Sequence, residues 1–267
     1  DEALAIQESL GELYLRAHTL EVRGHLSIMV EEYERGARLI EESVGLFRKV
    51  GNRLGLASAL QDLAWTRAVV GRFAEARTAA EDAYSLYRET GNLAGAAGIQ
   101  SLRTRIEFFA GEFQASIDLA KDMLALAERV GIGELRMVSY IHLGRAYWAS
   151  GALEESEEAW RNAYVFAEDE HRREDMSITL SGLVLVLLGR RRIEDASVLI
   201  ETMELLTEDE KDFNQVATIH VFRGRIALLA GNAAEAVEHL SRAHNLLRDS
   251  TRVRVSYNWD EGLRNEF

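Results

Sequence analysis

Apolar and polar residues alternate along this chain with the spacing of an α-helix, and the whole pattern recurs every forty residues. Similar segments follow six positions on one forty-residue grid: Glu31, Gly71, Gly111, Gly151, Arg191 and Gly231. In each segment, positions two, five, nine, twelve and sixteen residues after the grid point are mostly apolar or small. Steps of three and four residues place side chains on one face of an α-helix. The pattern therefore predicts an amphipathic helix after each grid point.

One position of this pattern holds a small residue in every copy. It lies five residues after the grid point and is occupied by Gly36, Ala76, Ser116, Ser156, Ala196 and Ala236. Where two helix backbones approach closely, only a small side chain leaves room, and larger neighbours fill the grooves. The column nine residues after the grid point is mostly apolar and reads Ile40, Ala80, Ala120, Trp160, Ile200 and Leu240. We therefore interpret the repeat as a unit of helix packing.

A second apolar helical segment precedes each grid point, as Leu56, Leu60 and Leu63 do before Gly71. Glycine adopts positive φ without steric cost and commonly ends a helix. Further glycines follow the amphipathic helices at Gly51, Gly91 and Gly131. The sequence thus predicts helix pairs joined by short turns, which is an all-α fold.

Small residues at two helix positions with aromatic residues around them resemble the tetratricopeptide repeat. The best copy is Tyr140-x-x-Leu143-Gly144-x-x-Tyr147, followed by Leu153, Ser156, Trp160 and Ala163. These residues fall at the eight signature positions of the family, and the resemblance covers about residues 13–248. The family's final proline is absent from every copy, and its usual period is about 34 residues. We therefore expect helices that are several residues longer than usual.

Long, proline-poor repeats of this kind resemble those of maltose-regulator-type ATP-dependent bacterial transcriptional regulators and related signalling NTPases and kinases. The resemblance implies an α-α superhelix (solenoid) of about six tetratricopeptide-like hairpins, forming a single array over residues 1–267. We expect residues 1–12 to end a preceding helix and residues 13–248 to form the six repeats. Residues 249–267 are expected to be a partial unit, a linker or vector-derived. Because the chain starts at Asp1 inside a helical pattern, we interpret it as a piece of a longer protein.

In the resembled superfamily, the first helix of each repeat lines a concave groove where partners bind. One groove position reads His25, Trp65, Arg105, Arg145, Leu185 and Arg225, and the position one turn later reads Ile28, Ala68, Phe108, Trp148, Leu188 and Leu228. The candidate binding residues are His25, Trp65, Arg105, Phe108, Arg145, Trp148 and Arg225. Arginine binds carboxylates through paired hydrogen bonds, and tryptophan supplies apolar area. The groove is therefore expected to take an acidic or amphipathic peptide.

Two alternatives stay open for this groove. In the first, the arginines bind no partner but pair with glutamates of the next layer, and Trp65 and Trp148 lie in the core or at its rim. In addition, Arg23, Arg103 and Arg223 stand where the family has leucine, which would fit a register shift of one residue in those copies.

Composition narrows the chemistry further. The chain has no proline and no cysteine, so helices are favoured, and disulfides, thiolate nucleophiles and Cys-ligated metals are excluded. Its net charge of −13, from 31 Lys and Arg against 44 Asp and Glu, disfavours direct nucleic-acid binding. Acidic runs at 154–158, 168–170 and 208–210 are expected to be solvated outer faces, or alternatively a docking surface for a basic protein. No apolar run reaches the ~18 residues of a membrane span and no signal peptide is present, so we expect no membrane contact and a cytoplasmic location.

Motifs for catalysis or cofactor binding are absent from the sequence. No phosphate-binding loop and no G-x-S-x-G motif occurs, and the seven histidines include no pair spaced three or four apart. Only one E-x-x-H pair is present, Glu168 with His171, whereas a di-iron helical bundle needs two. We therefore expect no enzyme activity, no cofactor and no metal.

We interpret the chain as a protein-protein interaction scaffold, the regulatory or sensor arm of a larger bacterial signalling or transcription-regulatory protein. Its expected partner is a protein or peptide, which includes further domains of the same polypeptide. The alternative is a domain that senses a small-molecule inducer, and a helical enzyme is the third and least supported hypothesis.

Overall fold

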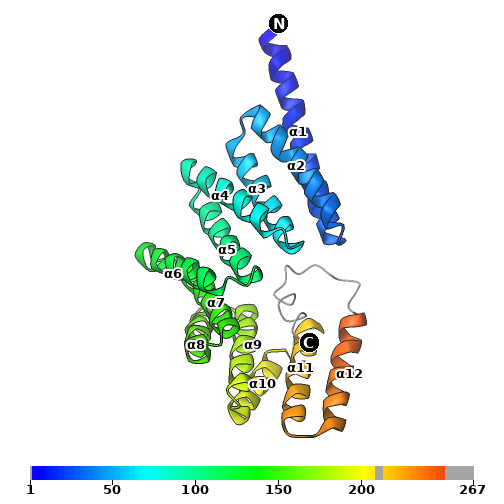
Figure 1. Cartoon of the computed structure of the whole chain (residues 1–267), viewed down its shortest axis with the longest axis vertical. Helices are drawn as coiled ribbons and strands as arrows, with labels where there is room; N and C mark the ends of the chain where they lie inside the picture. Colours follow the sequence, from blue (N-terminus) through cyan, green and yellow to red (C-terminus); the bar gives the residue numbers. More distant parts are fainter. Residues whose placement is uncertain (1, 208–212, 250–267) are drawn as a thin grey trace. The chain divides into compact units, whose positions relative to one another are not determined.

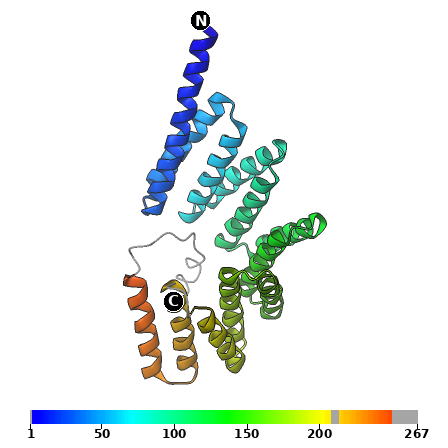
Figure 2. The ribbon, with the colours of Figure 1, turned by 180° about the vertical axis from the view of Figure 1, so that it is seen from behind.

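The structure is a computed structural model that describes residues 2–207 and 213–249. Twelve α-helices succeed one another in these ranges, which contain no strand (Figures 1 and 2). The first six are α1 Glu2–Met29, α2 Tyr33–Val50, α3 Arg53–Val69, α4 Phe73–Glu89, α5 Leu93–Phe109 and α6 Phe113–Val130. The last six are α7 Gly133–Ser150, α8 Leu153–Asp169, α9 Arg173–Gly189, α10 Ile193–Thr207, α11 Phe213–Leu229 and α12 Ala233–Asp249. The predicted all-α fold is confirmed.

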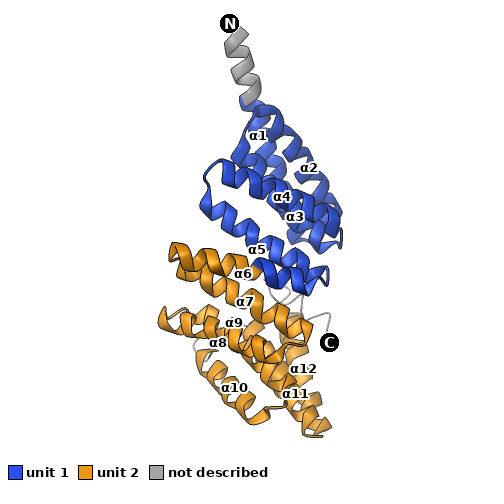
Figure 3. Ribbon diagram, turned by 60° about the vertical axis from the view of Figure 1, so that its left-hand side comes forward, with its two compact units in different colours: residues 1–119, 259–267 blue, residues 120–258 orange. Residues whose placement is uncertain are grey.

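The helices group into two compact units, coloured separately in Figure 3, and the division between them falls within α6. Of the described residues, those up to 119 form unit 1 and those from 120 onwards form unit 2. In both units an odd-numbered helix forms a hairpin with the next even-numbered helix, as α3 does with α4 and α7 with α8. We call the odd-numbered members first helices and the even-numbered members second helices.

Left-handed turn residues set the length of every helix between residues 31 and 231. They recur at intervals of twenty residues, apart from position 211, which lies outside the described residues: Glu31, Gly51, Gly71, Gly91, Gly111, Gly131, Gly151, His171, Arg191 and Gly231. The amide after each turn residue donates back to the last helical turn, as Asn52 N does to Phe47 O at 3.1 Å. This hydrogen bond satisfies a helix-end carbonyl and is typical of a Schellman motif. A helix of about 17 residues plus a short turn thus replaces the shorter helix of a 34-residue repeat, as predicted.

The column of small residues lies where the two helices of a hairpin approach each other. All six of its members are buried. The Ser156 hydroxyl donates to Gly144 O on the first helix at 2.6 Å, and Ser116 donates to Thr104 O at 3.0 Å. At Gly36, an added Cβ would lie 3.0 Å from Gly24 O, closer than almost any real Cβ contact. The predicted packing role of this column is confirmed.

First helices also pack against one another within each unit. In unit 1, α1 contacts α3 and α3 contacts α5, while in unit 2, α7 contacts α9 and α9 contacts α11. Among the described residues, second helices such as α2 and α4, or α8 and α10, do not pack closely in this way. Within each unit the first helices therefore lie on the more tightly packed side.

The start of the chain differs from expectation. Helix α1 is continuous over Glu2–Met29, so residues 2–12 extend the first helix and do not end a separate, preceding one. The expected break coincides with Gly11, which is on the twenty-residue grid but lacks the positive φ of the other grid glycines. A single glycine within a helix costs only about 1 kcal/mol, which the remaining helical residues offset.

None of the helices in the described ranges is long and apolar enough to cross a membrane.

Candidate functional site

The predicted groove residues occupy one equivalent position on successive first helices. Their column consists of half-buried residues in all six copies: His25, Trp65, Arg105, Arg145, Leu185 and Arg225. The preceding residue is buried in every copy: Gly24, Ala64, Thr104, Gly144, Val184 and Gly224. Because this alternation is constant, the register shift considered for three copies does not occur.

Two of the arginines that replace the family's leucine instead face a second helix of the preceding hairpin. Arg103 pairs with Glu81 on α4 at 2.8 Å, and its guanidinium lies 5.0 Å from the Tyr84 ring centroid. Arg223 binds both carboxylate oxygens of Glu204 on α10 at 2.7 Å. Interhelical ion pairs thus take the place of the leucine contacts.

In unit 1, the predicted residues Trp65 and Arg105 come together. The Arg105 guanidinium on α5 lies 4.2 Å from the Trp65 ring centroid on α3 and 5.9 Å from that of Phe109. The Trp65 and Phe109 rings are 6.3 Å apart, and Phe109 also contacts the predicted Phe108 at 5.9 Å. These four half-buried residues form what we call the Trp65–Arg105 stack. Sequence reasoning missed Phe109, although its place beside Phe108 on the first-helix face was a usable signal.

His25 belongs to a separate polar network on α1 and α3. Its Nε2 atom lies 3.2 Å from Asp62 Oδ1, and the hydrogen bond that it donates to Asp62 raises the pKa of His25 despite partial burial. Nearby, the buried Glu21 carboxylate accepts a hydrogen bond from the Ser58 hydroxyl at 2.9 Å and lies 3.1 Å from His18 Nδ1. The imidazole of His25, which was predicted to line the groove, is therefore bound to the Asp62 carboxylate.

In unit 2, the predicted residues Arg145 and Trp148 lie on α7 and Arg225 lies on α11, all half-buried. Their surroundings are more apolar than those of unit 1. The same face carries the half-buried residues Ile178, Leu185 and Val221, together with Leu228, which is 55% exposed, and Leu229, which is 38% exposed. The seven predicted residues therefore form two sets, one in each unit.

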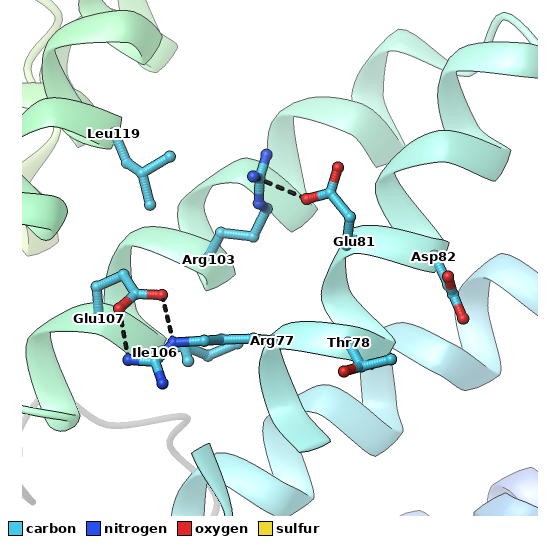
Figure 4. A pocket seen from close by; sticks show the side chains of 8 residues that line it. All are labelled: Arg77, Thr78, Glu81, Asp82, Arg103, Ile106, Glu107 and Leu119. Atoms are coloured by element: carbon cyan, nitrogen blue, oxygen red, sulfur yellow. Dashed lines mark hydrogen bonds and ion pairs between the residues drawn. The ribbon is translucent and has the colours of Figure 1, made fainter. Parts of the chain in front are cut away.

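A cavity of about 480 Å³ opens in unit 1 among α4, α5 and Leu119 (Figure 4). Four of its five charged side chains bind one another. Arg77 donates to both oxygens of Glu107 at 2.8 and 2.7 Å, and Arg103 pairs with Glu81, as the dashed lines in Figure 4 mark. A cavity of this volume suits a small ligand, but the two arginines and two glutamates that could recognise one are bound to each other.

One member of the acidic run 154–158 differs from expectation. Glu154, Glu155 and Glu158 are exposed, as predicted for a solvated face, whereas Glu157 is buried. Three arginines surround its carboxylate: Arg161 at 2.7 Å, Arg190 at 2.5 Å and Arg192 at 3.0 Å. Burial alone would raise the pKa of Glu157, but the Arg161 hydrogen bond and the three positive charges outweigh it, so the pKa is lowered. Arg190 and Arg192 belong to the α9–α10 turn, and the periodicity of residues within α8 does not reveal their contact with Glu157.

Within the described residues, no group of three or more His, Asp or Glu side chains is arranged to hold a metal ion.

No protein-family model matches the chain, and a search of curated proteins finds no relative. Solved structures do match it. Aspartyl phosphate phosphatase F from Bacillus subtilis is 11% identical, with a TM-score of 0.75 over 96% of this chain and 76% of that one. A Rap protein complexed with Competence and Sporulation Factor is 14% identical, with a TM-score of 0.67 over 88% of this chain and 66% of that one.

A third match is a Signal Transduction ATPase with Numerous Domains from Pyrococcus horikoshii, described as having a tetratricopeptide repeat sensor. It is 16% identical, with a TM-score of 0.70, and the match covers 95% of this chain but only 38% of that protein. Identities this low establish the fold alone. The chain has the all-α fold of the tetratricopeptide superfamily, built from tandem helix hairpins.

Proposed function

We propose that this chain is a protein-protein interaction scaffold that binds a peptide or protein segment along its first-helix faces. It serves as the regulatory or sensor arm of a larger, cytoplasmic signalling or transcription-regulatory protein of bacteria, and it needs neither cofactor nor catalytic residues. The observation that carries this proposal is the Trp65–Arg105 stack, an aromatic and cationic cluster at half-buried positions of the first helices.

The stack has the chemistry of a binding anchor. Tryptophan and arginine are enriched among the residues that dominate binding energy at interfaces. A guanidinium held over an indole ring keeps its edge directed for hydrogen bonds to a carboxylate, while the ring supplies apolar area. The stack therefore suits an acidic residue of the partner with an apolar neighbour.

Unit 2 adds a complementary surface of apolar side chains and two arginines. Arg145 and Arg225 lie on α7 and α11, with Leu185 at the equivalent position of α9 between them in sequence order. Neighbouring layers of packed helices lie about 10 Å apart, which places the two arginines about 20 Å apart. An amphipathic segment with two carboxylates about 20 Å apart could bind both arginines and cover the apolar side chains between them.

The matched structures add support of a general kind. The Rap protein is described in complex with Competence and Sporulation Factor, and the ATPase is described as carrying its repeats as a sensor. A partner-binding role for the same fold in this chain is consistent with both descriptions.

Peptide display against the folded chain tests the proposal. Selected peptides should be acidic or amphipathic and should bind saturably by fluorescence anisotropy. Arg145→Glu combined with Trp148→Ala should weaken binding to unit 2 at least tenfold, and Arg105→Glu should do so for ligands of unit 1. Charged contacts that lose one partner typically cost 2–5 kcal/mol, so a tenfold effect is a conservative expectation.

Arg129→Glu is the matched control, because it makes the same charge change at an exposed position of the second helix α6. If the control weakens binding as much as the first-helix variants, general electrostatics explains the affinity. Unchanged binding by all correctly folded first-helix variants would exclude these faces as the docking site.

A small-molecule sensor is the second candidate, favoured by the cavity in Figure 4. A metabolite that binds only the folded chain raises its melting temperature with the logarithm of ligand concentration. A thermal-shift screen of sugars, nucleotides and lipids should therefore give a hit that Arg77→Met abolishes if this candidate is right. A screen without hits favours the protein partner.

A further inference from the structure

Two histidines face each other across the last described hairpin. His220 on α11 and His239 on α12 place their Nδ1 atoms 2.9 Å apart, with ring centroids at 5.2 Å and planes inclined by 32°. Both are partly buried, and the His239 side chain is only 21% exposed. Nineteen residues separate them, so a search for helical His pairs at spacings of three or four does not find them.

The short distance fixes how many protons the two facing nitrogens hold. A hydrogen bond between them needs one N–H and one free lone pair. A pair of neutral imidazoles meets this condition, and so does one imidazolium facing one neutral ring. Two imidazolium rings do not, because two N–H groups and two positive charges would then oppose each other at 2.9 Å.

Charged groups from all three neighbouring helices face the pair. Helix α10 contributes Glu204, whose carboxylate is already bound by Arg223 of α11 through two hydrogen bonds of 2.7 Å. Helix α12 contributes Arg242, and Glu235, whose carboxylate lies 4.0 Å from His239 Nε2. Burial is the largest cause that lowers the pKa of His220, followed by the positive charges of Arg242 and His239.

We propose that His220 and His239 form a pH-sensitive latch of the α11–α12 hairpin, closed while their Nδ1 atoms share one proton and opened when both rings become charged. In the unfolded chain each histidine takes up a proton near its usual pKa of about 6.5. The folded pair resists the second proton. The contribution of the latch is therefore complete above about pH 6.5 and is lost as the pH falls below that value towards the lowered pKa of His220.

The latch would also regulate binding, an extension that rests on the proposed function. Helix α11 carries Arg225 five residues after His220, so loosening this helix at acid pH should weaken partners that use Arg225. The test of the latch uses the whole chain without any partner. A negative result for the latch is therefore distinguishable from a negative result for the docking proposal.

Amide hydrogen exchange of the whole chain at pH 7.5 and 5.5, corrected for intrinsic exchange rates, tests the latch. Protection in α11 and α12 should fall about tenfold on acidification, because the unfolded chain takes up the second proton and the folded pair resists it. His239→Asn keeps a hydrogen-bonding group near the Nδ1 position but does not titrate, so its protection should fall clearly less than that of the unmodified chain, and the remaining fall should come from the burial of His220. His244→Asn, an exposed position on the same helix, should behave like the unmodified chain.

Equal pH dependence in the unmodified chain and in His239→Asn would overturn the proposal. If His239→Asn unfolds at pH 7.5, nitrogen-15 NMR of the histidine rings in the unmodified chain decides the question. One ring of the pair should keep an unprotonated Nδ1 at pH 5.5, and two rings that titrate independently near pH 6.5 would refute the latch.

Discussion

The two units use the same backbone plan but present different chemistry on their first helices. In unit 1 the face carries the Trp65–Arg105 stack and the carboxylate-bound His25. In unit 2 the equivalent face is mostly apolar, with Leu185 and Leu228 among its members. Turn residues and the small-residue column fix the hairpin geometry in both units, so the face positions vary without disturbing it. Under the proposed function, each unit would recognise a different part of the partner.

The interiors also differ between the units at equivalent positions. In unit 2, Trp160 lies in a slot formed by glycines, and a Cβ added to Gly182 would come within 2.3 Å of the indole ring. In the copy eighty residues earlier, which lies in unit 1, the same two positions are Ala80 and Leu102. Large and small residues are thus exchanged between the two helices that meet there.

Substitution of this slot should have the largest effect on stability. Trp160→Ala should reduce the free energy of unfolding by about 3–5 kcal/mol, because it leaves a cavity. Gly182→Leu alone should cost about 1–3 kcal/mol or more through overpacking. The double variant recreates the Ala80–Leu102 arrangement and should be more stable than the sum of the two losses predicts, as measured by urea denaturation. Strict additivity would show that the two positions do not compensate each other.

Buried ion clusters of opposite polarity form a second contrast. In unit 1 the buried Arg67 guanidinium is surrounded by the carboxylates of Glu34, Glu41 and Glu75. In unit 2 the buried Glu157 carboxylate is surrounded by three arginines. Because the pKa of Glu157 is lowered by folding, its contribution to stability is present above the unfolded pKa near 4.5 and is lost as the pH falls through the folded value.

Glu157→Gln should therefore destabilise unit 2 by about 1–3 kcal/mol at pH 7, since hydrogen bonds to a charged group are lost. The difference from the unmodified chain should shrink as the pH falls below the unfolded pKa near 4.5 and through the lower pKa of the folded carboxylate. Thermal unfolding followed from pH 7 to pH 3 measures both effects. Glu158→Gln, exposed on the same helix, should change stability by less than about 0.5 kcal/mol at either pH.

Helix capping distinguishes the turns between hairpins. In unit 1, Asn52 and Asn92 accept hydrogen bonds from the Gly55 and Gly95 amides at 2.8 Å, whereas Ile132, at the start of α7 in unit 2, makes no such bond. Asn52→Ala should cost about 1 kcal/mol, and Ile132→Asn should add about 0.5–1 kcal/mol. Both shifts are within reach of urea denaturation. A destabilising Ile132→Asn would mean that the exposed isoleucine contributes packing that exceeds the value of a cap.

The smallest expected effect concerns the Trp65–Arg105 stack. A double-mutant cycle with Trp65→Leu and Arg105→Met should give a coupling energy of about 0.5–1 kcal/mol, typical of a cation–π contact at a partly exposed site. The equivalent cycle in unit 2 with Leu185→Ala and Arg225→Met should give coupling close to zero. A similar coupling in both units would contradict the contrast between their faces.

Periodicity predicted the features that every copy shares, and missed those that depend on a side chain outside the same helix. The burial of Ser116 and Ser156 follows from their place in a recurring column, because close backbone approach excludes larger residues. The burial of Glu157 depends on arginines in the α9–α10 turn, and the His220–His239 pair depends on how two helices meet. His171 and Arg191 adopt positive φ without being glycine, so the turn grid is visible only in part from residue types.

The twenty-residue rhythm of the left-handed turns restricts how the length of this molecule can change. Adding one residue within a helix would rotate everything after it by about 100° around the helix axis, which would bury the docking face and expose the packing column. Duplicating forty residues would instead insert one whole hairpin and preserve the contacts on either side. The row of first helices can therefore be lengthened by duplication, or shortened by deletion, in steps of one hairpin of about 10 Å.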